Sequence, residues 1–125
     1  MEKRKILIID DEPGFTRMVK LNLEAKKTYE VRELNNPAMV VQVACEFCPD
    51  IILLDVVMPG LDGGNVLSLL KADPVLKIIP VLFVTATVCK SEAEEHRRHI
   101  GGAFFIAKPV TAASLIQSIE EHVAV

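Results

Sequence analysis

The sequence lacks an excess of positive charge and has no long hydrophobic run. Its 14 Lys and Arg residues are outnumbered by 17 Asp and Glu residues, which gives a formal net charge of −3. Nonspecific nucleic-acid binding depends on a basic surface, so this balance argues against direct nucleic-acid contact. No apolar run approaches the roughly 20 residues that a membrane span needs. The run behind the basic residues 3–5 is too short for a signal peptide, so we read it as a first strand.

Cysteine and linker sequence are also scarce. The chain has three cysteines, an odd number, and no secretory signal, so we expect free thiols and a cytoplasmic location. No Gly/Ser-rich linker, repeat or low-complexity segment divides the 125 residues, and 50% of them are hydrophobic. This length and composition are typical of one domain with one sizeable core. We therefore predict a single domain over residues 1–125.

Short apolar runs alternate with longer amphipathic segments along the chain. The runs at 51–54 and 81–84 are continuously apolar, as in parallel strands covered on both faces. The alternation predicts strands at 4–9, 29–34, 50–54, 80–84 and 103–107, and helices at 13–26, 37–47, 63–71, 90–99 and 111–122. Five such units in a row predict an α/β fold, a parallel sheet with helices on both faces.

Local signals support several of these helices. Pro13 and Asn36-Pro37 suit helix starts, and Thr111 can cap the last helix. The predicted inner stripes are Phe15, Met18, Val19, Leu21 and Leu23 in the first helix, and Leu115, Ile116, Ile119 and Val123 in the last. Cys45 and Cys48 form a C-x-x-C pair late in a predicted helix, whereas redox motifs stand at helix starts, so we expect buried structural thiols there.

Charged or polar residues follow the predicted strands. Asp10 and Asp11 close the first strand and Asp55 closes the third, while Thr85 and Lys108 follow the fourth and fifth. In an open parallel sheet, working sites lie outside the carboxyl ends of the strands. Three carboxylates and one ammonium gathered there make a place for a divalent cation and a phosphoryl group.

Four segments at these positions carry a resemblance. They are the runs that end in Asp10-Asp11-Glu12-Pro13, Asp55 to Gly63, Pro80 to Ala86, and Lys108-Pro109. In this order and spacing they closely resemble the response-regulator receiver domain of two-component signalling, over essentially the whole chain. The resemblance implies a five-stranded parallel sheet of order 2-1-3-4-5, flavodoxin-like or CheY-like.

The resemblance also implies a role for each residue of the site. Asp55 would be the phosphoacceptor, and Mg2+, with Mn2+ as an alternative, would be held by Asp11 and Asp55 directly, by Asp10 through water, and by the backbone carbonyl of Val57. Lys108 would pair with phosphoryl oxygens and Thr85 would hydrogen-bond one of them. Thr85 and Phe105 would form the switch; plain core packing is the alternative for Phe105. No organic cofactor is expected.

A receiver would take its phosphoryl group from a sensor histidine kinase or a histidine phosphotransfer protein. It would then change a face made of the fourth helix, fifth strand and fifth helix, which would control a downstream protein or a linked output domain. It would not be a conventional turnover enzyme. A phosphorylation-dependent homodimer is a further hypothesis, and a stand-alone receiver and a part of a longer regulator or hybrid kinase both stay open.

Two other functions fit the same residues less well. A phosphatase of the haloacid-dehalogenase type requires a second Asp two residues after the nucleophile, but residue 57 of this chain is Val. A flavodoxin-like cofactor binder wants Gly, Ser and Thr in its first loop, where this chain has acids that would repel phosphate. Both are weaker predictions than the receiver.

Overall fold

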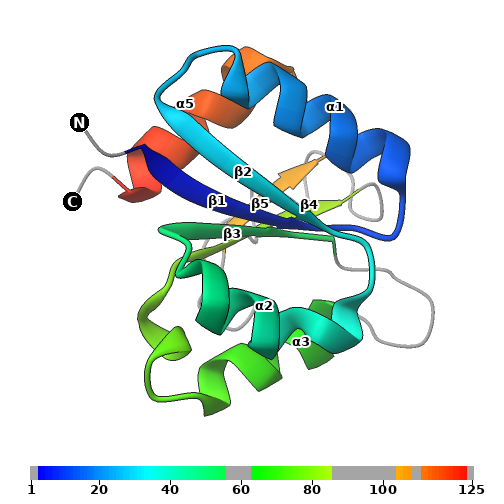
Figure 1. The fold of residues 1–125 in the computed structure, drawn as a ribbon, viewed down its shortest axis with the longest axis vertical. Coiled ribbons are helices and arrows are strands. Elements are labelled where there is room, and N and C mark those ends of the chain that lie inside the picture. Colours follow the sequence, from blue (N-terminus) through cyan, green and yellow to red (C-terminus); the bar gives the residue numbers. More distant parts are fainter. Residues whose placement is uncertain (1–2, 56–62, 86–103, 108–110, 124–125) are drawn as a thin grey trace.

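The computed structural model describes residues 3–55, 63–85, 104–107 and 111–123, and its centre is one parallel β-sheet (Figure 1). The sheet has five strands in the order β2-β1-β3-β4-β5, which confirms the predicted α/β topology. The strands are β1 (Arg4–Ile9), β2 (Tyr29–Leu34), β3 (Ile51–Leu54), β4 (Val81–Thr85) and β5 (Phe104–Ala107). All four strand pairings are parallel.

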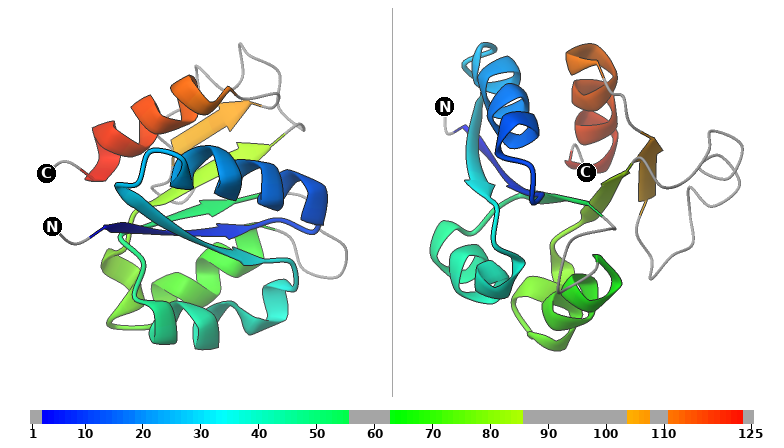
Figure 2. Two further views of the ribbon diagram at one scale, coloured as in Figure 1. Left: turned by 45° about the horizontal axis from the view of Figure 1, so that its top comes forward. Right: turned by 90° about the vertical axis from the view of Figure 1, so that its right-hand side faces the viewer.

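Helices cover both faces of the sheet. The helices are α1 (Pro13–Glu24), α2 (Val40–Phe47), α3 (Gly63–Ala72) and α5 (Ala112–Val123), with short 3-10 helices η1 (Pro37–Met39) and η2 (Leu76–Ile78). Helices α1 and α5 lie side by side on one face, and α2 and α3 lie on the other (Figure 2). In the part of the chain that the structure describes, no helix is long and apolar enough to cross a membrane.

The predicted strands agree with the observed ones to within one residue at each end, whereas two helices differ. The helix predicted over 37–47 begins as the 3-10 turn η1, whose first turn is capped by the Asn36 side chain accepting the Ala38 N–H, and it continues as α-helix from Val40. The first helix ends at Glu24 rather than at residue 26, and Lys27 then adopts a positive φ of 61° that turns the chain into β2. The helix predicted over 90–99 lies outside the described residues.

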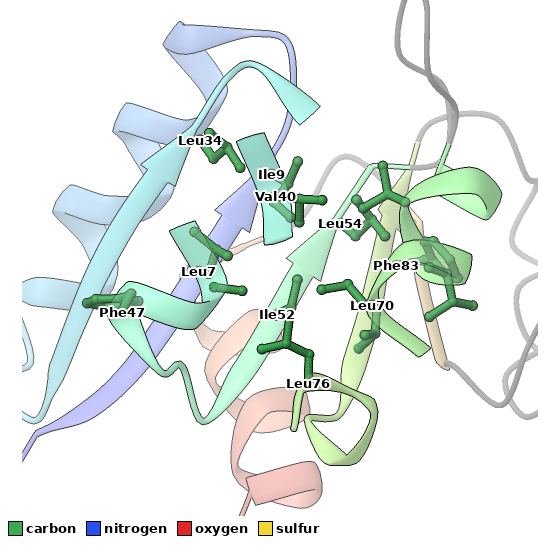
Figure 3. Close-up of a cluster of buried hydrophobic side chains, with 14 residues drawn as sticks. Leu7, Ile9, Leu34, Val40, Phe47, Ile52, Leu54, Leu70, Leu76 and Phe83 are labelled. Carbon is green, nitrogen blue, oxygen red and sulfur yellow. The ribbon is translucent and has the colours of Figure 1, made fainter. Parts of the chain in front are cut away.

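Alternate residues of each central strand point to opposite faces and build two cores. Figure 3 shows the core beneath α2 and α3, to which Leu7, Ile9, Ile52, Leu54 and Phe83 contribute. The core beneath α1 and α5 takes the intervening residues, namely Ile6, Ile8, Ile51, Leu53, Leu82 and Val84. Because both faces of β1, β3 and β4 are buried, these strands have the continuous apolar sequences that the prediction relied on.

Two predictions about helix faces were wrong. In α1, Val19 and Leu23 are buried, but Met18 and Leu21 are 43% and 63% exposed. Leu21 lies about 200° around the helix from both buried residues, so one narrow face cannot include all three. In α2 the inner face is Val40, Ala44 and Phe47; Cys45 and Cys48 each lie one position beyond it, and both are exposed rather than buried.

One backbone amide on the outer edge of β2 is paired with a side chain. The backbone N–H of Val31 donates to the Glu24 carboxylate at 3.0 Å, from the last turn of α1. Val31 sits in β2, which among the strands that the structure describes is at the edge of the sheet, beside β1. This amide faces away from β1, and Glu24 gives it a hydrogen-bond acceptor that no neighbouring strand supplies in the described structure.

Candidate functional site

Three aspartates gather at the carboxyl ends of β1 and β3. Asp10, Asp11 and Asp55 each offer a carboxylate oxygen, and these oxygens all lie within 4.8 Å of one another. Asp10 and Asp55 are buried, at 1% and 7% exposure, and Asp11 is half-buried. Three like charges at this spacing repel one another strongly where water is partly excluded, so the arrangement favours a bound cation.

The sheet itself brings the aspartates together. The backbone N–H of Asp10 donates to the Leu34 carbonyl at 3.1 Å, and that of Asp55 donates to the Ile9 carbonyl at 3.0 Å. Both residues are therefore tied to a neighbouring strand through their own backbone, one position beyond the end of β1 or β3. β1 and β3 are neighbours in the sheet. The chain runs from β1 to β2 on one side and then crosses to β3 on the other side of β1, so the direction of winding reverses here. This is the point of a doubly wound sheet at which ligands bind.

A tight turn presents the first two aspartates. The Asp10 carboxylate accepts the N–H of Glu12 at 2.9 Å, which is the geometry of an Asx turn. Helix α1 then begins at Pro13, and the Glu12 carbonyl accepts the N–H groups of Phe15 and Thr16. The positive end of the α1 dipole thus lies beside the acidic cluster and lowers its electrostatic cost.

A further set of polar residues, which was not predicted from the sequence, supports this turn. The side-chain amide of Asn35 donates to the Asp10 carbonyl at 2.8 Å and to the Thr16 hydroxyl at 3.1 Å. Thr16 is fully buried, and its oxygen lies 2.9 Å from the Glu33 carboxylate. Glu33 in turn pairs with Arg17 at 3.2 Å. Asn35 follows the second strand, so the strand-end criterion that selected Asp10 could have selected it too.

The donor set fits a hard divalent cation. Mg2+ prefers oxygen ligands at about 2.1 Å in an octahedron, which places neighbouring and opposite ligand atoms about 3 and 4 Å apart. Carboxylate oxygens that already lie within 4.8 Å of one another need only small side-chain movements to reach that geometry. Among the described residues, these acids are the one group of three or more His, Cys, Asp or Glu side chains whose ligand atoms lie close enough to share a metal ion.

Of the remaining predicted site residues, two are located by their positions in strands, and two lie outside the described part of the chain. Thr85 is the last residue of β4, which lies next to β3 in the sheet, and it is in register with Ala107 of β5. Phe105 is in register with Phe83. Lys108 and Val57 lie outside the described residues. The structure thus brings together Asp10, Asp11 and Asp55, and puts Thr85 at the same edge of the sheet.

Comparison with known proteins gives a consistent result. The family model described as "Response regulator receiver domain" matches residues 6–120. Response regulator PleD of Caulobacter vibrioides is 34% identical over 115 residues, which are 92% of this chain but 25% of PleD. Protein PilH of Pseudomonas aeruginosa is 33% identical over 121 residues, which are 96% of this chain and 98% of PilH.

A solved structure with the same fold is also similar in sequence. It is the signal receiver domain of a signal transduction histidine kinase from Syntrophus aciditrophicus. The two chains share 29% sequence identity with a TM-score of 0.79, and the match covers 97% of this chain and 90% of that one. The chain thus spans about a quarter of PleD, but nearly the whole of PilH.

Proposed function

The chain belongs to the response-regulator receiver family of two-component signal transduction, and from this we propose that Asp55 accepts a phosphoryl group from a phosphohistidine of a partner protein. The partner would be a sensor histidine kinase or a histidine phosphotransfer protein. The observation that carries the proposal is the gathering of Asp10, Asp11 and Asp55 at one end of neighbouring strands. Asp55 would serve as the nucleophile, and all three acids would take part in holding the cation.

In the proposed reaction, a carboxylate oxygen of Asp55 attacks the phosphorus in line. The bond that forms joins this oxygen to phosphorus, and the product is an acyl phosphate. The bond that breaks joins phosphorus to the histidine nitrogen of the donor, and that nitrogen keeps the electron pair. A bound Mg2+ would offset negative charge on the phosphoryl oxygens. Asp11 and Asp55 would hold it directly, Asp10 through water, and the Val57 carbonyl would add another oxygen.

Two further residues complete the proposed site. Lys108 would pair with the phosphoryl oxygens as a mobile point charge, and Thr85 would donate a hydrogen bond to one of them. The position of Thr85 at the carboxyl end of β4 supports this role. Thr85 and Phe105 would then change the face formed by the fourth helix, β5 and α5, to which a downstream protein or a linked output domain would bind. The domain would catalyse only its own phosphorylation and dephosphorylation.

Intact mass after incubation with acetyl phosphate tests the proposal. We expect one added phosphoryl group on the wild type with Mg2+, and none without Mg2+ or in Asp55→Ala. Asp50→Ala is the matched control, because the exposed Asp50 carboxylate accepts the Lys5 N–H at 2.8 Å and lies before β3 rather than after it. An adduct that persists in Asp55→Ala, or one that forms equally well without Mg2+, would contradict the proposal.

A further inference from the structure

Asn35 lies where the regular pairing of β1 and β2 stops. The two strands are in register up to the pair Ile9 and Leu34, and the Asp10 N–H still donates to the Leu34 carbonyl. A continuing parallel ladder would next bring the N–H of Asn36 to the Asp10 carbonyl. Instead Asn36 begins η1 with its side chain on the Ala38 N–H, and the Asn35 side chain donates to the Asp10 carbonyl at 2.8 Å.

This hydrogen bond acts on the peptide that joins the two metal acids. The Asp10 carbonyl and the Asp11 N–H belong to one planar peptide group, so fixing the carbonyl fixes the direction in which Asp11 leaves the strand. On the other side, the Asp10 carboxylate is held by the Glu12 N–H at 2.9 Å. The turn is therefore held at two points, one on its backbone and one on a side chain.

The Asn35 amide is itself held by a buried partner. Its second contact is the Thr16 hydroxyl, which is 0% exposed in the first turns of α1. Because that oxygen accepts from Asn35, its own hydrogen is available for the Glu33 carboxylate at 2.9 Å, a charge-assisted bond that is stronger than the 3.2 Å contact to the Pro13 carbonyl. Arg17 fixes the other oxygen of Glu33 at 3.2 Å.

We propose that Asn35 is a positioning residue for the divalent cation. It acts by orienting the Asp10–Asp11 peptide, and Thr16 and Glu33 hold its amide in place. This inference rests on the proposed function, because it assumes that the aspartate cluster binds Mg2+. Residues that orient metal ligands typically alter metal affinity by about 10- to 100-fold when they are removed. Asn35 is an exposed residue and water can replace part of its contact, so we expect the lower end of that range.

Calorimetric titration of the full chain with Mg2+ alone tests the inference. We expect Asn35→Ala to raise the Kd about tenfold. Asn36→Ala is the matched control: it removes the neighbouring amide and the cap of η1, but that side chain contacts Ala38 rather than the acidic turn. Its Kd should equal that of the wild type, although its stability falls. Thr16→Val should also raise the Kd, and Thr16→Ser, which keeps the hydroxyl, should not.

A second readout separates affinity from chemistry. If Asn35 acts only on the cation, phosphorylation of Asn35→Ala by acetyl phosphate should be slow at low Mg2+ and recover at saturating Mg2+. A Kd of Asn35→Ala equal to that of the wild type overturns the positioning role while the proposed function stands. Equal weakening in Asn35→Ala and Asn36→Ala overturns it as well, since it indicates general loosening. A wild type that binds no Mg2+ overturns the proposed function, and this inference with it.

Discussion

Tyr29 of β2 donates its phenolic hydrogen bond to the carboxylate of Glu120 in α5, 91 residues further along the chain. The ring is buried, at 1% exposure, in the core beneath α1 and α5. Burial, together with the hydrogen bond and the negative charge of Glu120, raises the pKa of Tyr29 from 10.0 to about 12, although Arg4 opposes the shift. This contact ties the edge strand β2 to the last helix.

The raised pKa of Tyr29 predicts a loss of stability at high pH. The folded protein holds the phenolic proton more tightly than the unfolded chain, so this contribution is complete below pH 10 and is lost as the pH rises toward about 12. The expected fall in the free energy of unfolding is on the order of 2 kcal/mol. Urea denaturation at pH 9 to 12 should show this fall in the wild type and not in Tyr29→Phe. Glu120→Gln, which keeps the burial but removes the charge, should show a smaller fall; an equal fall in all three proteins would refute the assignment.

Mg2+ should stabilise the folded chain by mass action. At a free concentration of ten times the Kd, the free energy of unfolding should rise by about 1.4 kcal/mol, because the unfolded chain does not gather the three aspartates. Urea denaturation with and without MgCl2, at matched ionic strength, measures the increment. Asp11→Asn should lose most of it. An increment of the same size in Asp11→Asn would mean that the cation binds elsewhere.

The two cores predict where truncation is costly. Leu53 is fully buried in β3, so Leu53→Ala should lower the free energy of unfolding by about 2–5 kcal/mol, through lost burial and the cavity it leaves. Leu21→Ala removes the same atoms from a side chain that is 63% exposed, and should change the free energy by less than about 0.5 kcal/mol. Chemical denaturation of both variants gives the comparison. Similar losses at the two sites would contradict the observed orientation of α1.

Thr111 caps α5, as predicted from the sequence. Its hydroxyl accepts the Ser114 N–H at 3.0 Å, and its own N–H donates to the Ser114 hydroxyl at 3.2 Å. Thr111→Ala should therefore lower the free energy of unfolding by about 1 kcal/mol, whereas Thr111→Ser, which keeps the acceptor, should lose little. Thermal or urea denaturation distinguishes them. If the two variants were equally destabilised, the hydroxyl would not be the cause.

The family and the sheet could be predicted from the sequence, because each rests on local residue patterns. β3 is a run of four apolar residues followed by Asp55, and this pattern gives a strand buried on both faces together with the end that carries the site. The family model over residues 6–120 confirms the predicted family. The predicted roles of Lys108, Thr85, Phe105 and Val57 stay predictions.

Other features depend on contacts that the sequence does not display. The exposure of Leu21 depends on which face of α1 packs against β2 and α5. Apolar spacing alone does not identify that face, and it wrongly predicts Leu21 as an inward-facing residue. Burial of Cys45 is predicted because helices often bury thiols, but the face of α2 that packs on the sheet is that of Ala44 and Phe47, and Cys45 lies one position beyond it. Asn35 is a polar residue after a strand, and its importance appears only once the Asp10 carbonyl, 25 residues away in sequence, lies beside it.

The bond between Glu24 and the Val31 N–H has a consequence for how copies of this chain meet one another. An open strand edge is a template onto which a strand of a second molecule can add, which is a common route to aggregation. Such a strand arriving at β2 would have to displace a carboxylate from the Val31 amide and leave that charge beside a new, water-poor interface. The bond from Glu24 therefore disfavours the addition of a second strand at Val31, and it comes from a helix rather than from the strand itself.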